Sequence, residues 1–143
     1  MSRANWINTS AAALIGRSAG LDADTQERLE LTAIVHDIAC PLCREKYGSA
    51  KGSDQEAESE PLVRAFFADF DLPPQMLERI VYLVCHHHTY TGVDGADYQI
   101  LLEADYLVNA SEQHASADSV REFCSRVVKT PAAQRLFDSI YLG

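Results

Sequence analysis

The chain has 143 residues, of which 47% are hydrophobic and 23% charged. We expect one globular domain over residues 1–143, because this length and composition exclude a disordered chain. Twelve basic and twenty-one acidic residues give a formal charge of −9, which disfavours binding to nucleic-acid polymers and anionic membranes. The sequence contains no apolar run of the ~18 residues that a membrane span needs and no signal peptide, so it predicts a cytoplasmic protein.

The first part of the chain is predicted to form two helices. Residues 5–19 have a helical pattern that stops at Gly20, and glycine is common just after a helix. Asp22 or Asp24 is expected to cap the second helix, which continues to Cys40 and is broken by Pro41. The cysteines are expected to be thiols, because disulfides are rare in the cytosol.

The remaining segments also have helical patterns separated by polar joints. Residues 48–54 are predicted as a loop, and the next helix, with Pro61 in its first turn, extends to Phe70. Pro73 and Pro74 open a helix that leads into three consecutive histidines. Further helices are expected over residues 98–109, 117–128 and 131–142. With no alternating strand pattern of useful length, the sequence predicts an all-α bundle of six to seven helices.

Several polar residues stand where a helix should be apolar. His36 continues the line of Leu29 and Ala33, and Asp37 lies at the edge of that face. After the double proline, His87 falls near the middle of the apolar face, His88 toward one edge and His86 nearly opposite.

Asp105 gives the same signal on a later helix, where it shares a face with leucine and valine. A buried carboxylate without a partner is unfavourable, and so is an imidazole whose nitrogens are unsatisfied. Sharing a metal ion would satisfy both, and nitrogen and carboxylate ligands suit Fe, Mn, Zn, Co or Ni. Alternatively, each histidine is a hydrogen-bonded core residue and Asp105 pairs with Arg79 or Lys46.

Three segments together resemble the HD-domain superfamily of metal-dependent phosphohydrolases. They are AIVHDIA at residues 33–39, HHHTYTG at 86–92 and EADYLVN at 103–109. The resemblance extends from about Leu14 to Asn109 and implies a helical fold that binds one or two divalent transition metals.

Carried over from that family, His36 and Asp37 form the His-Asp doublet and Asp105 is the closing ligand. His87 matches a ligand position of two-metal members, with His88 as the alternative. A further ligand is expected within QEAESEP at residues 55–61, where Glu58 is the first candidate and Glu56 the second.

The first histidine of the family pattern is missing. It is expected around residues 4–8, but the chain has no histidine before His36. Two explanations are open: the chain starts late, or a divergent site uses fewer protein ligands, with water or one of the asparagines there, Asn5 or Asn8, at that position.

The resemblance implies a phosphohydrolase that acts on a small phosphorylated compound, with a nucleotide as one candidate. Asp37 would bind metal and orient the attacking water, while His88 or His86 would donate a proton to the leaving group. Lys46, Arg44 and Lys51 are the nearest cations able to hold a phosphate.

Two other functions compete with this one. The first is a catalytically impaired regulator that binds a metal or nucleotide, and the missing histidine favours it. The second is a helical structural protein whose inward histidines and aspartates pair with one another. A homodimer through the C-terminal helices is compatible with the sequence.

Overall fold

A computed structural model gives the fold of residues 3–143, so the first two residues of the predicted domain lie outside the described range. The described chain is all-helical, as predicted, and none of its helices is long and apolar enough to cross a bilayer. The helices are α1 (Arg3–Ser18), α2 (Ala23–Val35), α3 (Cys40–Tyr47), α4 (Gly52–Phe66), α5 (Pro74–Val84), α6 (Ala96–Glu112), α7 (Ala117–Arg126) and α8 (Pro131–Phe137), followed by a π-helical turn, η1 (Asp138–Leu142).

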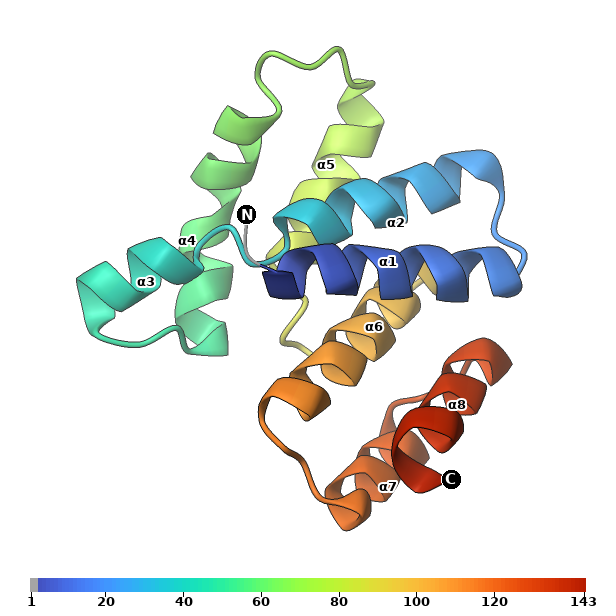
Figure 1. Ribbon diagram of the computed structural model, residues 1–143. Helices are drawn as coiled ribbons and strands as arrows, with labels where there is room; N and C mark the ends of the chain where they lie inside the picture. Colours follow the sequence, from blue (N-terminus) through green and yellow to red (C-terminus); the bar gives the residue numbers. More distant parts are fainter. Residues whose placement is uncertain (1–2) are drawn as a thin grey trace.

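Helices α1, α2 and α6 form the centre of the molecule. Figure 1 shows α1 and α2 side by side, with α6 crossing against both. Helix α5 packs on α2, and α4 and α3 follow outward from α5 on one side. Helices α7 and α8 lie at the other end, where α8 contacts α6.

This arrangement has two hydrophobic cores. The larger core joins α1, α2 and α6 to the C-terminal helices and includes Ile15, Leu101 and Phe137. The smaller core joins α2, α4 and α5 and includes Val63 and Ile80. Because α2 contributes to both cores, residues at its C-terminal end lie where the two meet.

The second helix is shorter than predicted. Helix α2 ends at Val35, and Pro41 lies in the first turn of a separate helix, α3. Proline is tolerated there because the first backbone N–H groups of a helix have no intrahelical acceptor. His36 keeps helical backbone angles as the residue that follows α2, so its predicted inward direction is retained.

The prediction for α4 was wrong at both ends. The helix starts at Gly52, inside the expected loop, so that Pro61 lies in its interior rather than in its first turn. It ends at Phe66 rather than Phe70. The earlier start fixes which side chains face inward, namely Gln55, Ser59 and Val63.

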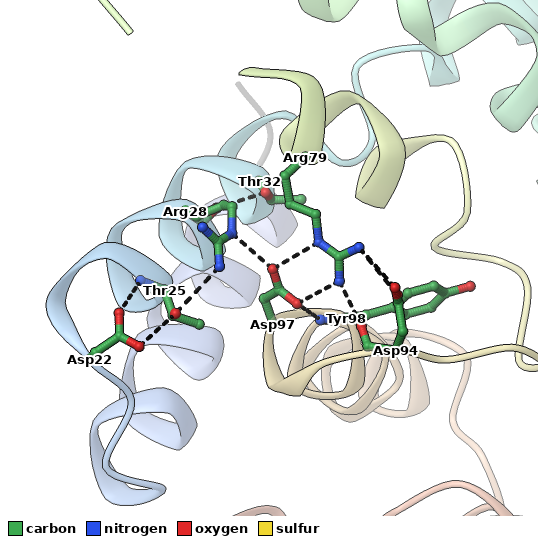
Figure 2. A network of polar contacts seen from close by, with 8 residues as sticks. All are labelled: Asp22, Thr25, Arg28, Thr32, Arg79, Asp94, Asp97 and Tyr98. Carbon is green, nitrogen blue, oxygen red and sulfur yellow. Dashed lines mark hydrogen bonds and ion pairs between the residues drawn. The ribbon is translucent and has the colours of Figure 1, made fainter. Parts of the chain in front are cut away.

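A buried aspartate fixes the start of α6. Asp97 accepts hydrogen bonds from Arg28 of α2 at 2.9 Å and from Arg79 of α5 at 2.9 and 3.1 Å, and also from the Tyr98 backbone N–H. Figure 2 shows its carboxylate between the two guanidinium groups, with Arg79 extending to Asp94. The ion pairs therefore connect three helices and hold α6 in register against α2 and α5.

Candidate metal centre

Side chains from four parts of the chain meet at the junction of the two cores. Asn8 comes from α1, His36 follows α2, His87 follows α5 and Asp105 projects from the middle of α6. All four are buried, with exposed fractions between 0 and 4%. This confirms the predicted inward direction of both histidines and of Asp105.

The first group of potential ligands consists of His36, Asp37 and Asp105. His36 Nε2 lies 3.1 Å from Asp105 Oδ1 and 3.0 Å from Asp37 Oδ2. One imidazole nitrogen thus faces two carboxylates from different helical segments.

The second group consists of Asp37, His87 and His88. Asp37 Oδ1 lies 3.7 Å from His87 Nε2, and the His87 and His88 ring centroids are 4.0 Å apart. Asp37 therefore belongs to both groups and turns a different oxygen atom toward each. In each group the candidate ligand atoms lie within 4.8 Å of one another, which is close enough for them to share an ion.

Backbone carbonyls orient both buried imidazoles. His36 Nδ1 lies 2.7 Å from the Ala33 carbonyl oxygen, and His87 Nδ1 lies 2.6 Å from that of Val84. A carbonyl oxygen only accepts, so both Nδ1 atoms carry the donated proton. In the neutral imidazole this leaves a lone pair on Nε2, directed at the cluster, as in histidines that bind metals.

The cluster contains unsatisfied polar atoms. Among the described residues, three buried side-chain atoms have no hydrogen-bond partner, and two of them, Asn8 Oδ1 and His87 Nε2, belong to cluster residues; the third is Gln26 Oε1. Buried polar atoms are almost always paired, so this concentration needs a physical reason. A bound cation would be such a reason for His87 Nε2. This nitrogen lies 3.7 Å from Asp37 Oδ1 and forms no hydrogen bond with it.

Without a metal, the two carboxylates and the imidazole stabilise each other as ions. Burial opposes protonation of His36, but hydrogen bonds to Asp105 and Asp37 and their charges outweigh it and raise its pKa to about 10. Burial likewise opposes ionisation of Asp37, yet the neighbouring His36 and His87 lower its pKa well below the ordinary value. The cluster therefore favours positive charge at its centre.

His88 lies at the edge of the cluster. Its Nε2 is 3.1 Å from Gln55 Oε1, and its backbone N–H donates to Glu56 Oε1 at 3.1 Å. Burial and the neighbouring His87 lower the pKa of His88. Its imidazole is therefore neutral at pH 7, which suits a metal ligand or proton acceptor.

Gly52 permits the close approach of α4 to this histidine. A Cβ at position 52 would lie only 2.8 Å from the Cβ and Cγ atoms of His88. The start of α4 is thus part of the wall that positions His88.

A cavity of about 780 Å³ adjoins the second ligand group. Its walls include Asp37, His88, Arg44, Gln55, Phe66 and Asn109. Arg44 is exposed and forms no ion pair with any residue in the range 3–143. The cavity therefore combines potential metal ligands with an unpaired cation and an aromatic ring.

Two predicted site residues lie away from the cluster. Glu58 accepts hydrogen bonds from Lys46 and from the Tyr47 hydroxyl, both at 2.6 Å, on the side of α4 that faces α3. It belongs to neither ligand group, and Lys46 is held by Glu58 and does not line the cavity. Lys51 is exposed next to the start of α4. His86 donates a hydrogen bond from Nδ1 to the Tyr82 backbone carbonyl, and its ring stacks on the Tyr82 side chain.

The proposed structural partners of Asp105 are engaged elsewhere. Arg79 binds Asp94 and Asp97, and Lys46 binds Glu58. The alternative in which one of these cations pairs with Asp105 is therefore contradicted. Its partners are His36 and Asn8.

Sequence analysis left Asn8 as one of several options and did not select Gln55. Asn8 shares a buried face of α1 with Ala12 and Ile15, so its four- and seven-residue spacing to apolar positions could have singled it out. Gln55 could not be chosen without the true start of α4.

No protein-family model matches this chain, and neither does any curated protein or solved structure. The chemistry of the site therefore has to be argued from its own residues.

Proposed function

We propose that this protein binds divalent transition metal at the His36–Asp37–Asp105 and Asp37–His87–His88 groups. The observation that carries this proposal is the position of Asp37 between two imidazoles, with a different oxygen toward each and His87 Nε2 left unpartnered. No hydrogen bond among the described residues satisfies that nitrogen, whereas a bound cation would accept its lone pair.

We further propose that the metal centre serves a phosphohydrolase of the HD-domain type. The His-Asp doublet, the histidine run and the downstream aspartate that suggested this family from sequence are the residues that supply both ligand groups. A bound divalent ion supplies Lewis acidity, which lowers the pKa of a coordinated water and neutralises phosphoryl oxygens.

The chain's own residues suit a small phosphorylated substrate. The adjoining cavity, of about 780 Å³, is in the range of small-molecule sites. Arg44 lines it and is available for a phosphate group, whereas Lys46 is neutralised by Glu58. The ring of Phe66 offers a surface for the organic part of the substrate, with a nucleotide as one candidate.

Asp37 and His88 are the groups placed to handle the attacking water and the proton. Asp37 lines the cavity and belongs to both ligand groups, so it can orient a water molecule toward a phosphate held there. When metal is held by the His36–Asp37–Asp105 group alone, His88, which lines the same cavity within reach of Gln55, can exchange a proton with the reacting groups.

Phosphate release tests this activity. The Mn²⁺-loaded protein would be incubated with a panel of nucleoside 5′-monophosphates and simpler phosphate monoesters. We expect turnover that is lost in Asp37→Ala and falls at least tenfold in Arg44→Ala through a higher KM, while Lys46→Ala retains activity. Equal effects of Arg44→Ala and Lys46→Ala would contradict the assignment of Arg44.

The same assay separates the competing functions. Stoichiometric metal without turnover of any ester would contradict the phosphohydrolase and favour the regulatory protein. Failure to bind metal would leave a structural protein with a hydrogen-bonded cluster.

A further inference from the structure

Asn8 contacts the first ligand group directly. Its side-chain Nδ2 lies 3.3 Å from His36 Nε2 and 3.2 Å from Asp105 Oδ1. The residue is only 2% exposed, and its Oδ1 has no hydrogen-bond partner among the described residues. A buried amide with an unused oxygen thus adjoins two potential metal ligands.

The spacing of these atoms fits adjacent ligands of one ion. The amide terminus of Asn8, His36 Nε2 and Asp105 Oδ1 form a triangle with sides of 3.1 to 3.3 Å. Neighbouring ligand atoms around an octahedral ion with bonds of about 2.1 Å lie about 3.0 Å apart. The amide terminus of Asn8 therefore lies where a further ligand of the His36–Asp105 group would lie.

A triangle without a metal leaves a polar conflict in either state of His36. A protonated Nε2 and the amide N–H of Asn8 can both donate to Asp105 Oδ1, but Asn8 Oδ1 then stays without a partner among the described residues. If Nε2 carries a lone pair, that lone pair faces the acceptor Asp105 Oδ1.

A cation at the centre of the triangle would remove these conflicts. Turning the amide by 180° exchanges its oxygen and nitrogen with no change of shape. The turn gives up the hydrogen bond from Nδ2 to Asp105 but none of Oδ1, which has no partner among the described residues. Asn8 Oδ1, His36 Nε2 and Asp105 Oδ1 would then all direct lone pairs at the ion.

We propose that Asn8 is a metal ligand through Oδ1 and that it shifts the selectivity of the His36–Asp37–Asp105 subsite toward Mn²⁺. This inference rests on the proposed metal centre. With Asn8 the subsite offers one imidazole nitrogen and three oxygen ligands, and carbonyl and carboxylate oxygens suit Mn²⁺, whereas imidazole suits Zn²⁺, Fe²⁺ and Ni²⁺.

The test is a comparison of Mn²⁺ and Zn²⁺ affinities among substitutions of Asn8. Mn²⁺ binding would be measured from the electron paramagnetic resonance signal of the free ion, and Zn²⁺ binding by competition with a chromophoric chelator. The variants are Asn8→Ala, Asn8→Asp and Asn8→His, with thermal melts in EDTA to verify folding. Asn109→Ala is the matched control, because Asn109 lines the cavity and its side chain forms no hydrogen bond with His36 or Asp105.

We expect Asn8→Ala to weaken Mn²⁺ binding about tenfold or more and Asn8→Asp, which keeps an oxygen ligand, to retain it. Asn8→His should raise the Zn²⁺-to-Mn²⁺ affinity ratio about tenfold or more, and Asn109→Ala should leave both affinities unchanged.

Unchanged affinities in folded Asn8→Ala and Asn8→His would overturn the role of Asn8 and leave the metal centre intact. Loss of Mn²⁺ binding in Asn8→Asp as large as in Asn8→Ala would also overturn it. A wild-type protein that binds neither ion would instead contradict the metal centre itself.

Discussion

Helix α6 carries two buried aspartates in contrasting surroundings. Asp97, at its start, lies between the guanidinium groups of Arg28 and Arg79 and also accepts a backbone hydrogen bond. Asp105, eight residues later, forms side-chain hydrogen bonds only with a histidine and an asparagine among the described residues. The first carboxylate is neutralised by permanent cations. The second is neutralised by a histidine that can give up its proton to bind a metal, beside an asparagine that can also act as a ligand.

This difference separates a structural cluster from a candidate ligand site. Arginine remains charged at every accessible pH, so the Asp97 cluster is complete within the protein. Histidine and asparagine can both act as metal ligands, and Asn8 Oδ1 beside Asp105 and His87 Nε2 in the adjacent ligand group are unpartnered. A buried aspartate alone therefore does not identify a metal site. The residue types that surround its carboxylate distinguish the two cases.

The largest effect should follow removal of Asp97. Asp97→Ala leaves Arg28 and Arg79 without their buried counter-charge and should lower the free energy of unfolding by about 3 kcal/mol. Urea denaturation in EDTA measures this. Asp94→Ala is the control, because the exposed Asp94 binds the same arginine and should contribute less than about 1 kcal/mol. Equal losses in the two variants would contradict a structural role specific to Asp97.

Metal should stabilise the protein only through the candidate metal site that contains Asp105, and not through the Asp97 ion pairs. At a free Mn²⁺ concentration one hundred times the Kd, the free energy of unfolding should rise by about 2.7 kcal/mol. Asp105→Ala should reduce this increase, because it removes a ligand from one of the two groups, and Asp97→Ala should keep it. Urea titrations with and without Mn²⁺ measure the increase. If Mn²⁺ raised the free energy of unfolding of Asp105→Ala as much as that of the wild type, the result would contradict the role of Asp105 as a ligand.

Acid should weaken the Asp97 cluster. Burial opposes its ionisation, but Arg79 and Arg28 lower its folded pKa below the ordinary 3.8, so the unfolded chain binds the proton more tightly. Its contribution is complete above that value and is lost as the pH falls through the folded pKa. The difference in stability between wild type and Asp97→Asn should therefore shrink below pH 4. A constant difference from pH 6 to pH 3 would argue against the ion pairs as its source.

The smallest effect on stability should come from His87. In EDTA, the free energy of unfolding of His87→Leu should lie within about 1 kcal/mol of the wild-type value. The substitution loses one hydrogen bond to Val84 but also removes an unpartnered nitrogen. The same variant should bind less metal. Destabilisation as large as that of Asp97→Ala would indicate that His87 is a structural residue.

Helical periodicity was sufficient to predict the all-α fold and the inward direction of His36, His87 and Asp105. These predictions succeed because a side chain's face follows from its spacing to apolar neighbours on the same helix. The helix boundaries were harder to predict, since Pro41 could either end one helix or begin another.

Contacts between helices could not be read from single-helix patterns. Glu58 was chosen as a ligand from its segment alone, but the start of α4 at Gly52 turns Gln55 inward and Glu58 toward Lys46. The Asp97 network was missed for the same reason, because its two arginines lie on helices far apart in sequence. Arg28 and Arg79 could be assigned to Asp97 only once the helices were packed.

Metal content tests the central claim most directly. Protein purified without added metal would be analysed by elemental analysis beside Asp37→Ala, and both would then be analysed again after incubation with Mn²⁺ or Fe²⁺ and removal of excess ion. The account predicts one to two equivalents of metal per wild-type chain and loss of that metal in folded Asp37→Ala. Wild-type protein free of metal after both treatments, or equal metal in the variant, would contradict it.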